Sequence, residues 1–291
     1  KQTGGSQKEY FSKNLRLKFQ NTDELQSQIL EGLENGEFEA FYQPQIESRS
    51  GKLVGFEALA RWRHPERGVL TPFHFLDALE EADLLFQLDL QIMQTSFAEM
   101  RGWMDAGYDV PQVSINLSSD RLLRPDLLDS LTIAAQEAGV PTSKIGIEIL
   151  ESAMIDESAA RMIDNINKLS DAGFVVELDD FGTGHASVSN LQNFKVDRIK
   201  IDRSFVKDIH LQTDLAKITS AMIGLAHSLR IDALAEGVET PEERLILNAL
   251  GCDHIQGFGV SHPLPASQVA PWIKKTQLAK RELPARKEPA H

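Results

Sequence analysis

The stretch of sequence that decides the fold is residues 174–201, FVVELDDFGTGHASVSNLQNFKVDRIKI. It opens with a short apolar run, typical of a buried strand, which ends on the adjacent aspartates Asp179 and Asp180. A short helix is expected over residues 187–194, and a second apolar run follows at residues 198–201. A strand, a helix and a strand in this order predict two parallel strands joined by a crossover helix.

The same alternation occupies most of the chain. Further strands are expected at residues 38–43, 53–59, 113–117, 145–150, 231–235 and 253–256. Further helices are expected at residues 23–35, from 72 onward, 91–106, 125–139, 157–172, 213–229, 241–250 and 266–274. About eight such units in about 250 residues favour a closed, TIM-like (β/α)₈ barrel. A doubly wound open sheet, the alternative, would place a glycine-rich phosphate turn after its first strand, and the sequence has none there. The sequence therefore predicts an α/β barrel with its active site at the C-terminal ends of the strands.

Composition limits the partners and the compartment. The net charge of −13 disfavours a broad basic surface, so we expect neither DNA binding nor direct membrane contact from this segment. The single cysteine, Cys252, excludes an internal disulfide and a cysteine-rich zinc cage, and it favours a cytoplasmic location. No apolar stretch reaches the roughly 20 residues that cross a bilayer. Any membrane anchor of the full-length protein would therefore come from upstream segments outside this sequence.

Single polar residues close the apolar runs, one run after another. An unpaired charge at the end of a buried strand is costly, so this repetition predicts one shared polar site. Most of these polar residues are carboxylates or amides, whose oxygens suit Mg²⁺ or Mn²⁺. Two such metal ions held close together commonly catalyse phosphoester hydrolysis. The alternative is that these residues are scattered surface carboxylates and helix caps. The set consists of Glu57, Asn116, Glu148, Asp179, Asp180, Lys200, Glu236 and Gln256.

The motifs around these residues resemble the EAL-domain family of cyclic di-GMP phosphodiesterases. They are YQP at 42–44, EAL at 57–59, NLS at 116–118, DDFGTG at 179–184, KIDRSFV at 200–206, AEGVET at 235–240 and QGF at 256–258. We expect the EAL domain to occupy residues 21–275. Residues 1–20 look like a linker or the tail of a preceding diguanylate-cyclase (GGDEF-type) domain. Residues 276–291 are charged, contain proline and lack periodicity, so a disordered C-terminal tail is expected there.

The resemblance implies a metal-dependent hydrolysis of cyclic di-GMP to linear pGpG, which would lower this second messenger in bacterial signalling. It implies a two-metal site for Mg²⁺ or Mn²⁺, which Ca²⁺ is expected to inhibit. The implied metal ligands are Glu57, Asn116, Glu148, Asp179, Asp180 and Glu236. The implied catalytic residues are Lys200, which contacts the nucleophilic water, together with Glu57 and Glu236. The implied substrate-binding residues are Gln43, Leu59, Arg61, Asp202 and Gln256, and the implied loop-stabilising residues are Glu151 and Glu239.

This chain departs from the family pattern at two places near the tandem aspartate. Leu150 stands where the family usually has threonine, and His185 and Ala186 stand where it has tyrosine and serine. These changes bear on the rate and its regulation more than on the chemistry. The alternative function is therefore a catalytically weak or inactive cyclic di-GMP receptor. A homodimer is also expected, with its contact through the short helix at residues 187–194.

Overall fold

The computed structural model describes residues 24–151, 159–183 and 195–282. This part of the chain divides into two units. The smaller unit contains the residues up to 39 together with 60–92, and the larger unit contains residues 40–59 and those from 93 onward. The helix expected at residues 187–194, His185 and Ala186 lie outside the described residues, as do the expected linker at residues 1–20 and the end of the C-terminal tail.

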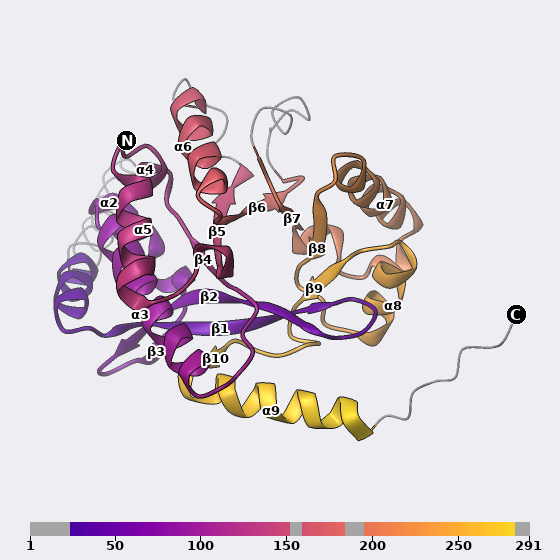
Figure 1. Ribbon diagram of the computed structural model, residues 1–291, viewed down its shortest axis with the longest axis horizontal. Helices are drawn as coiled ribbons and strands as arrows, with labels where there is room; N and C mark the ends of the chain where they lie inside the picture. Colours follow the sequence, from indigo (N-terminus) through magenta and orange to yellow (C-terminus); the bar gives the residue numbers. More distant parts are fainter. Residues whose placement is uncertain (1–23, 152–158, 184–194, 283–291) are drawn as a thin grey trace, which may run out of the picture. The chain divides into compact units, whose positions relative to one another are not determined.

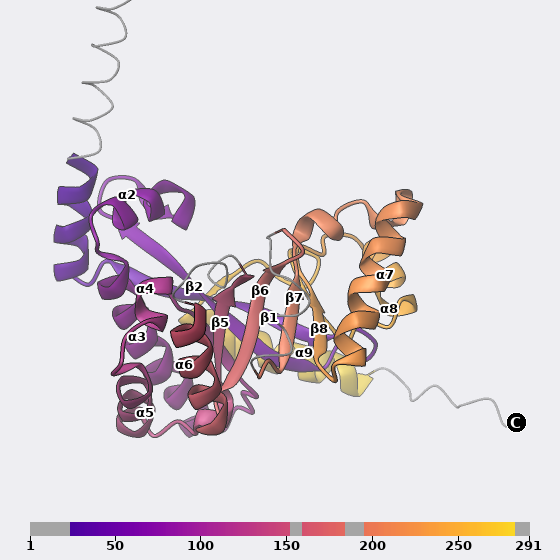
Figure 2. The ribbon, with the colours of Figure 1, turned by 90° about the horizontal axis from the view of Figure 1, so that it is seen from above.

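The larger unit is built on a closed eight-stranded barrel, which confirms the predicted fold class. The hydrogen-bonded order is β1, β9, β8, β7, β6, β5, β4 and β2, and β2 pairs with β1 to close the ring. Figure 2 shows β5 to β8 side by side. The strands are β1 (Phe38–Glu47), β2 (Leu53–His64), β4 (Val113–Asn116), β5 (Ile145–Leu150), β6 (Val175–Phe181), β7 (Arg198–Ile201), β8 (Asp232–Ala235) and β9 (His254–Gln256).

Helices cover the outside of this barrel. Figure 1 shows α7 and α8 on the outer side of β8 and β9. Helix α8 begins with a capping box, in which Thr240 accepts from the backbone N–H of Glu243 and the Glu243 carboxylate accepts from that of Thr240. The helices are α3 (Leu85–Asp105), α4 (Ser119–Leu122), α5 (Leu127–Ala138), α6 (Ala159–Asp171), α7 (Thr213–Ser228), α8 (Pro241–Ala249) and α9 (Ala266–Glu282). The 3₁₀ helices η2 (Thr142–Lys144), η5 (Arg203–Phe205) and η6 (Ile209–Leu211) and the short strand β10 (Leu264–Pro265) complete the unit.

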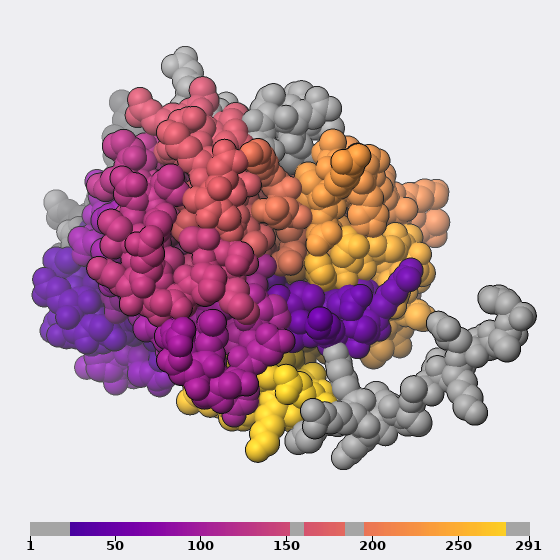
Figure 3. Space-filling model, in the orientation of Figure 1, coloured from indigo at the N-terminus to yellow at the C-terminus, as the bar shows by residue number. Residues whose placement is uncertain are grey.

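Strand β1 runs antiparallel to its neighbour β9. In an ordinary (β/α)₈ barrel all neighbouring strands are parallel. Strand β1 is joined to β2 by the short connection at residues 48–52, and so short a connection reverses the chain direction. The tip of this hairpin packs on α8, where the Arg244 guanidinium donates to the Ser48 carbonyl at 3.0 Å and 3.3 Å. Figure 3 shows the tip at the surface beside the orange and yellow segments. Consequently, the N-terminal part of β1 lies at the end of the barrel where the parallel strands finish.

The smaller unit is held together by aromatic side chains. The Phe38 ring stacks on Trp62 with ring centroids 5.2 Å apart, and it meets Phe75 edge-on at 5.3 Å. The indole N–H of Trp62 donates to the Glu37 carboxylate at 2.9 Å. The helix expected from residue 72 is in fact two short pieces, the second of which ends at Glu81, two residues before Asp83, which has a left-handed φ. The unit also holds a helix at residues 24–34, β3 (Gly68–Leu70), which pairs with the end of β2, η1 (Pro72–His74) and α2 (Leu76–Glu81).

Helix α9 corrects one expectation. It continues to Glu282, so the disordered tail predicted from residue 276 is wrong over residues 276–282. This segment, TQLAKRE, contains neither glycine nor proline and consists largely of good helix formers, which explains why the helix does not stop at Thr276. Among the helices of the described ranges, none combines the length and apolar character that crossing a membrane requires.

Candidate active site

Lys200 lies at the centre of the site. Its side chain is fully buried inside the barrel, and its ammonium is surrounded by four carboxylates that come from four different parts of the sheet. The distances from Lys200 Nζ are 2.5 Å to Glu148, 2.9 Å to Glu236, 3.2 Å to Asp179 and 3.4 Å to Glu57. One ammonium cannot balance four carboxylates, so this end of the barrel attracts further cations.

The strands bring the predicted polar residues to one end of the barrel, although Glu57 and Glu148 do not close their strands as expected, because β2 and β5 continue beyond them. Glu57 lies in β2, Asn116 ends β4, Glu148 lies in β5, and Glu236 directly follows β8. Since parallel strands finish at the same end of the barrel, their polar residues meet there.

Two amides orient the Glu57 carboxylate. Asn116 Nδ2 donates to Glu57 Oε1 at 3.3 Å, and Gln256 Nε2 donates to Glu57 Oε2. Gln256 Nε2 also lies 3.1 Å from Gln43 Oε1, to which it donates. Gln43 lies near the middle of β1, and its side chain reaches the site through this hydrogen bond.

A β-bulge presents the tandem aspartate. In the pairing of β6 with β7, Leu178 opposes Ile199 and Phe181 opposes Ile201, so that Asp179 and Asp180 together oppose Lys200 alone. Asp180 has a φ of +55°, which is uncommon for a residue other than glycine, and its backbone N–H donates to Asp179 Oδ1 at 3.0 Å. In a regular strand these two carboxylates would point to opposite faces. Here oxygens of Asp179, Asp180 and Glu236 lie within 4.8 Å of one another, and this cluster could hold a metal ion.

Burial and crowding shift the protonation of the cluster. Burial raises the pKa of Glu236 to about 8, and burial together with the Glu57 charge raises the pKa of Glu148 well above its usual range. Burial would lower the pKa of Lys200, but the surrounding carboxylates outweigh it and hold that pKa well above its usual value. Burial also raises the pKa of Asp179, and it does so for Asp180 with the help of the neighbouring Asp179 charge. The single positive charge of Lys200 is thus too small to offset the repulsion among these crowded carboxylates.

Glu57 behaves differently from the other acids. Burial alone would raise its pKa, but the Lys200 charge and the hydrogen bonds from Gln256 and Asn116 outweigh burial and lower it. Glu57 is therefore held as a carboxylate with a fixed orientation.

The donor set fits a divalent metal of the magnesium type. Its ligand atoms are oxygens of carboxylates and an amide, which Mg²⁺ and Mn²⁺ prefer. Glu148 Oε1 is buried and has no hydrogen-bond partner among the described residues, although its other oxygen binds Lys200. A bound cation would satisfy this orphaned oxygen and would replace the protons that the raised pKa values imply.

A cavity of about 260 Å³ opens above the cluster. At its rim the Phe258 ring lies 4.1 Å from the imidazole of His262, centroid to centroid. The cavity brings predicted metal ligands together with three predicted substrate-binding residues, Gln43, Leu59 and Gln256. Its lining consists of Gln43, Glu57, Leu59, Asp179, Arg203, Glu236, Gly237, Glu239, Gln256, Gly257 and Phe258.

The remaining predicted residues lie around this cavity or in the smaller unit. Glu151 accepts from the backbone N–H of Gly182 at 2.8 Å, which ties the end of β5 to the loop after the tandem aspartate. The Glu239 carboxylate pairs with Arg203 at 2.6 Å. Asp202 caps η5 by accepting from the Ser204 N–H at 2.9 Å. Arg61 lies in the smaller unit, where its guanidinium donates to the Ala60 carbonyl at 2.8 Å.

Sequence reasoning missed polar residues both at the cavity and in the barrel interior below it. Arg203 lines the cavity, and its position inside the KIDRSFV motif was a usable signal. Glu177 and Arg198 are buried two positions before Asp179 and Lys200, on the same strands. Residues two apart on a strand face the same side, so this spacing was the signal that would have found them.

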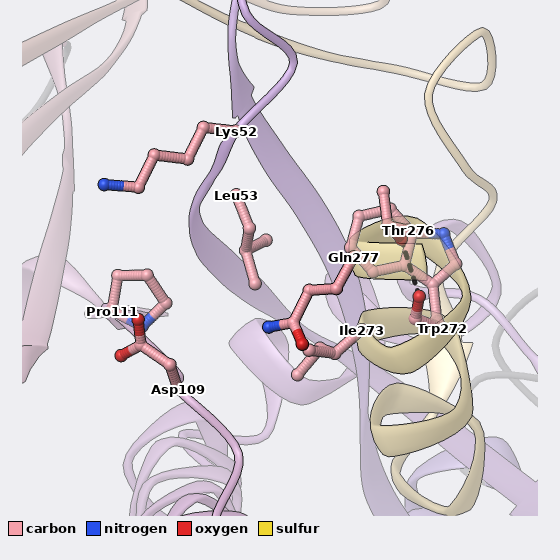
Figure 4. Close-up of a pocket in the computed structure, with 8 residues that line it drawn as sticks. All are labelled: Lys52, Leu53, Asp109, Pro111, Trp272, Ile273, Thr276 and Gln277. Carbon is pink, nitrogen blue, oxygen red and sulfur yellow. Dashed lines mark hydrogen bonds between the residues drawn. The ribbon is translucent and has the colours of Figure 1, made fainter. Parts of the chain in front are cut away.

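A second cavity, of about 190 Å³, lies beside α9 and the start of β2 (Figure 4). In this view Leu53 lies between Asp109 and Pro111 on one side and the α9 residues on the other. The cavity is mostly apolar and has one carboxylate, so it offers no metal-ligand set. Its lining consists of Lys52, Leu53, Asp109, Pro111, Trp272, Ile273, Thr276 and Gln277.

A closed barrel with carboxylates and a buried lysine at the C-terminal ends of its strands defines an α/β-barrel protein with a candidate metal site. The family model described as the EAL domain matches residues 25–263, and the chain belongs to this family. The model gives no support for a GGDEF-type remnant, because it begins at residue 25.

Several relatives carry a described activity. The cyclic di-GMP phosphodiesterase RocR of Pseudomonas aeruginosa is 35% identical over 237 residues, which are 81% of this chain and 60% of RocR. The bifunctional diguanylate cyclase/cyclic di-GMP phosphodiesterase MucR of the same organism is 33% identical over 261 residues, or 89% of this chain and 38% of MucR. The chain thus spans about a third of the length of several curated relatives, as with MucR and with an uncharacterized signaling protein of Caulobacter vibrioides (33%).

Solved structures share the fold. The PaMucR phosphodiesterase in complex with c-di-GMP has a TM-score of 0.80 and 32% identity, covering 84% of this chain and 99% of that one. The EAL enzyme Bd1971, bound to cAMP and cyclic di-GMP, has a TM-score of 0.83 and 30% identity, covering 90% of this chain and 72% of that one.

Proposed function

We propose that this chain is a metal-dependent phosphodiesterase that hydrolyses cyclic di-GMP to linear pGpG. The observation that carries the proposal is the Lys200 ammonium held among four carboxylates at the mouth of the barrel, with a buried Glu148 oxygen left unpaired among the described residues. The names of RocR and PaMucR support the choice of substrate. The all-oxygen donor set supports Mg²⁺ or Mn²⁺ as the metal.

Each residue has a definite part in this proposal. Divalent cations at the carboxylates would polarise the phosphate and lower the pKa of a bound water. Lys200 contacts the attacking water and stabilises the charge that develops on the phosphate. Asn116 and Gln256 keep Glu57 in a fixed orientation through their hydrogen bonds.

The substrate would lie in the 260 Å³ cavity, which already brings Gln43, Leu59 and Gln256 together. Arg61 and Asp202 are proposed as substrate-binding residues on the resemblance alone. Glu151 and Glu239 would hold the loops around the site, a role supported by their bonds to Gly182 and Arg203.

The test is direct. The chain is incubated with cyclic di-GMP and either Mg²⁺ or Mn²⁺, and the products are separated by chromatography. We expect linear pGpG, and we expect none without the metal. Binding of cyclic di-GMP with no turnover in either metal would contradict the phosphodiesterase proposal and would assign the alternative function, a cyclic di-GMP receptor.

Three further proposals concern the context of the domain. Residues 1–20 would be the end of a preceding GGDEF-type domain, as the bifunctional relative MucR suggests. The location would be cytoplasmic, in agreement with a single cysteine that is buried and free. The chain would form a homodimer through residues 187–194. Light scattering over a concentration series tests the dimer, and a mass that stays monomeric throughout would contradict it.

A further inference from the structure

A second polar layer lies inside the barrel, directly below the candidate site. Glu177 is two positions before Asp179 on β6, and Arg198 is two positions before Lys200 on β7. Alternate strand residues face the same side, so both side chains point into the barrel below the site residues, and both are buried. Below we use the name polar floor for the layer formed by Gln45, Gln112, Ser114, Glu177 and Arg198.

One connected set of hydrogen bonds joins the floor. Glu177 Oε1 accepts from Arg198 Nη1 at 3.2 Å, from Ser114 Oγ at 2.9 Å and from Gln112 Nε2. Arg198 Nη1 also donates to Gln45 Oε1 at 3.1 Å. The floor therefore links β1, β4, β6 and β7 across the inside of the barrel, and these strands carry Gln43, Asn116, Asp179 and Lys200 one step higher.

Two glycines leave room for the floor. Gly55 and Gly146 stand two positions before Glu57 and Glu148, so neither β2 nor β5 places a side chain of its own below its glutamate. A Cβ atom at Gly146 would overlap Ser114 Oγ and Gln112 Nε2. The space under the two glutamates is thus filled by floor side chains that come from other strands.

The floor also stands next to the β-bulge. Glu177 and Arg198 are register partners, and the regular pairing of β6 with β7 breaks off one residue later, after Leu178. The bulge sets the direction in which Asp179 and Asp180 point, and a shift of one residue in strand register turns side chains to the opposite face. The inward-facing ion pair between Glu177 and Arg198 therefore lies in the regularly paired part of β6 and β7, directly before the bulge.

We propose that the polar floor positions the site above it. Glu177 is a positioning residue: by binding Arg198 and the β4 residues, it holds β6 and β7 in register and so sets where the tandem aspartate and Lys200 lie. This proposal rests on the proposed function in one respect: the groups that the polar floor positions are the proposed metal ligands. The alternative is that the floor balances buried charge and contributes to stability alone.

Three variants of the full chain distinguish these roles. Glu177→Leu removes the acceptor. Glu177→Gln keeps an oxygen that can still accept from Arg198 and Ser114. The double variant Glu177→Leu with Arg198→Leu replaces the buried ion pair with apolar side chains of similar size, which restores stability in many proteins. Asn165→Ala is the matched control, because Asn165 is buried in α6, away from the barrel interior, and donates to the carbonyls of Leu122 and Arg124 at 2.7 Å and 3.1 Å.

Mn²⁺ affinity, thermal stability, kcat and KM are measured for each variant. Removing a group that orients a metal site typically costs about tenfold or more in affinity or rate. For Glu177→Leu we expect weaker Mn²⁺ binding in an electron paramagnetic resonance titration and a lower kcat, each by about tenfold, with little change in KM. Glu177→Gln should keep most of the Mn²⁺ affinity and most of the wild-type kcat. The double variant should regain stability without regaining Mn²⁺ affinity.

The outcomes separate the two proposals. A double variant with wild-type Mn²⁺ affinity, or a Glu177→Leu loss no larger than that of Asn165→Ala, would overturn the positioning role. A wild-type chain that binds Mn²⁺ without hydrolysing cyclic di-GMP would overturn the function alone, and the Mn²⁺ titration would still decide the role of the floor. A wild-type chain that binds no Mn²⁺ would overturn both.

Discussion

Replacing Lys200 with methionine is the sharpest test of the site, because methionine fills similar space without the charge. The ammonium lies 2.5 to 3.4 Å from four carboxylates. At an effective dielectric constant of about 20, one such pair has a gross attraction of about 5 kcal/mol before the cost of desolvation. Much of this attraction offsets the free-energy cost of burying the charges. Removing one partner of a buried ion pair typically costs about 3 to 5 kcal/mol in stability.

The structure indicates the lower end of this range for the metal-free protein at pH 7. Burial raises the pKa of Glu236 to about 8 even beside Lys200, so its protonated form is favoured at this pH and little negative charge is left unpaired there when Lys200 is lost. The other acids with raised pKa values can also take up protons when Lys200 is lost. We therefore expect a loss of about 3 kcal/mol in the free energy of unfolding. We expect the rate to fall by about 10² to 10³, the cost of losing one preorganised group that stabilises the transition state.

The assay measures pGpG formation at saturating metal, with Mn²⁺ binding followed separately to show that the site is filled. Lys144→Met is the matched control, because the Lys144 ammonium is partly buried and donates to the Val110 carbonyl at 2.6 Å, outside the carboxylate cluster. This control should keep the wild-type rate. If Lys200→Met filled its metal site and turned over at the wild-type rate, the role of Lys200 as the group that contacts the water would be wrong.

Three other predictions follow from the same cluster. Asp179→Asn should weaken metal binding and lower the rate by at least about tenfold, measured with the same two assays, whereas equal values in variant and wild type would remove Asp179 from the ligand set. Because the folded-state pKa of Glu236 is raised from 4.5 to about 8, its contribution to stability is present at low pH and is lost as the pH rises through 8. The melting temperature of the metal-free chain should therefore fall between about pH 5 and pH 8, and saturating Mg²⁺ should reduce this fall; a pH-independent difference between the two forms would contradict the assignment. Ca²⁺ accepts looser coordination, so it should permit cyclic di-GMP binding in calorimetry but block turnover, and full activity in Ca²⁺ alone would speak against a mechanism that needs tight geometry.

The sequence predicted the ring of polar residues well because the signal is local. One polar residue at the end of each apolar run is visible without any knowledge of distances, and parallel strands bring such residues together. Lys200, Glu148 and Glu57 meet in the structure for this reason. The bulge was not predictable in the same way, since it depends on how β6 pairs with a strand that is more than fifteen residues further along.

The polar floor escaped prediction for a different reason. Strands that are buried on both faces read as continuous apolar runs, so the pattern does not show which residues point inward. Glu177 stands inside such a run, and it was read as part of a strand rather than as a partner of Arg198. The direction of β1 was open to prediction, because few residues separate the expected strands at 38–43 and 53–59, but its consequence for Gln43 needs the closed barrel.

The reversal of β1 has a mechanical consequence. In a barrel whose strands are all parallel, the chain enters the first strand at the base, far from the chemistry. Here β1 runs in the opposite direction, and its residue Gln43 accepts a hydrogen bond from Gln256 at the candidate site. Because β1 carries Gln43 to the candidate site and leads directly into the hairpin that Arg244 anchors at the other end of the barrel, a displacement of this strand along its axis would move Gln43 relative to Gln256.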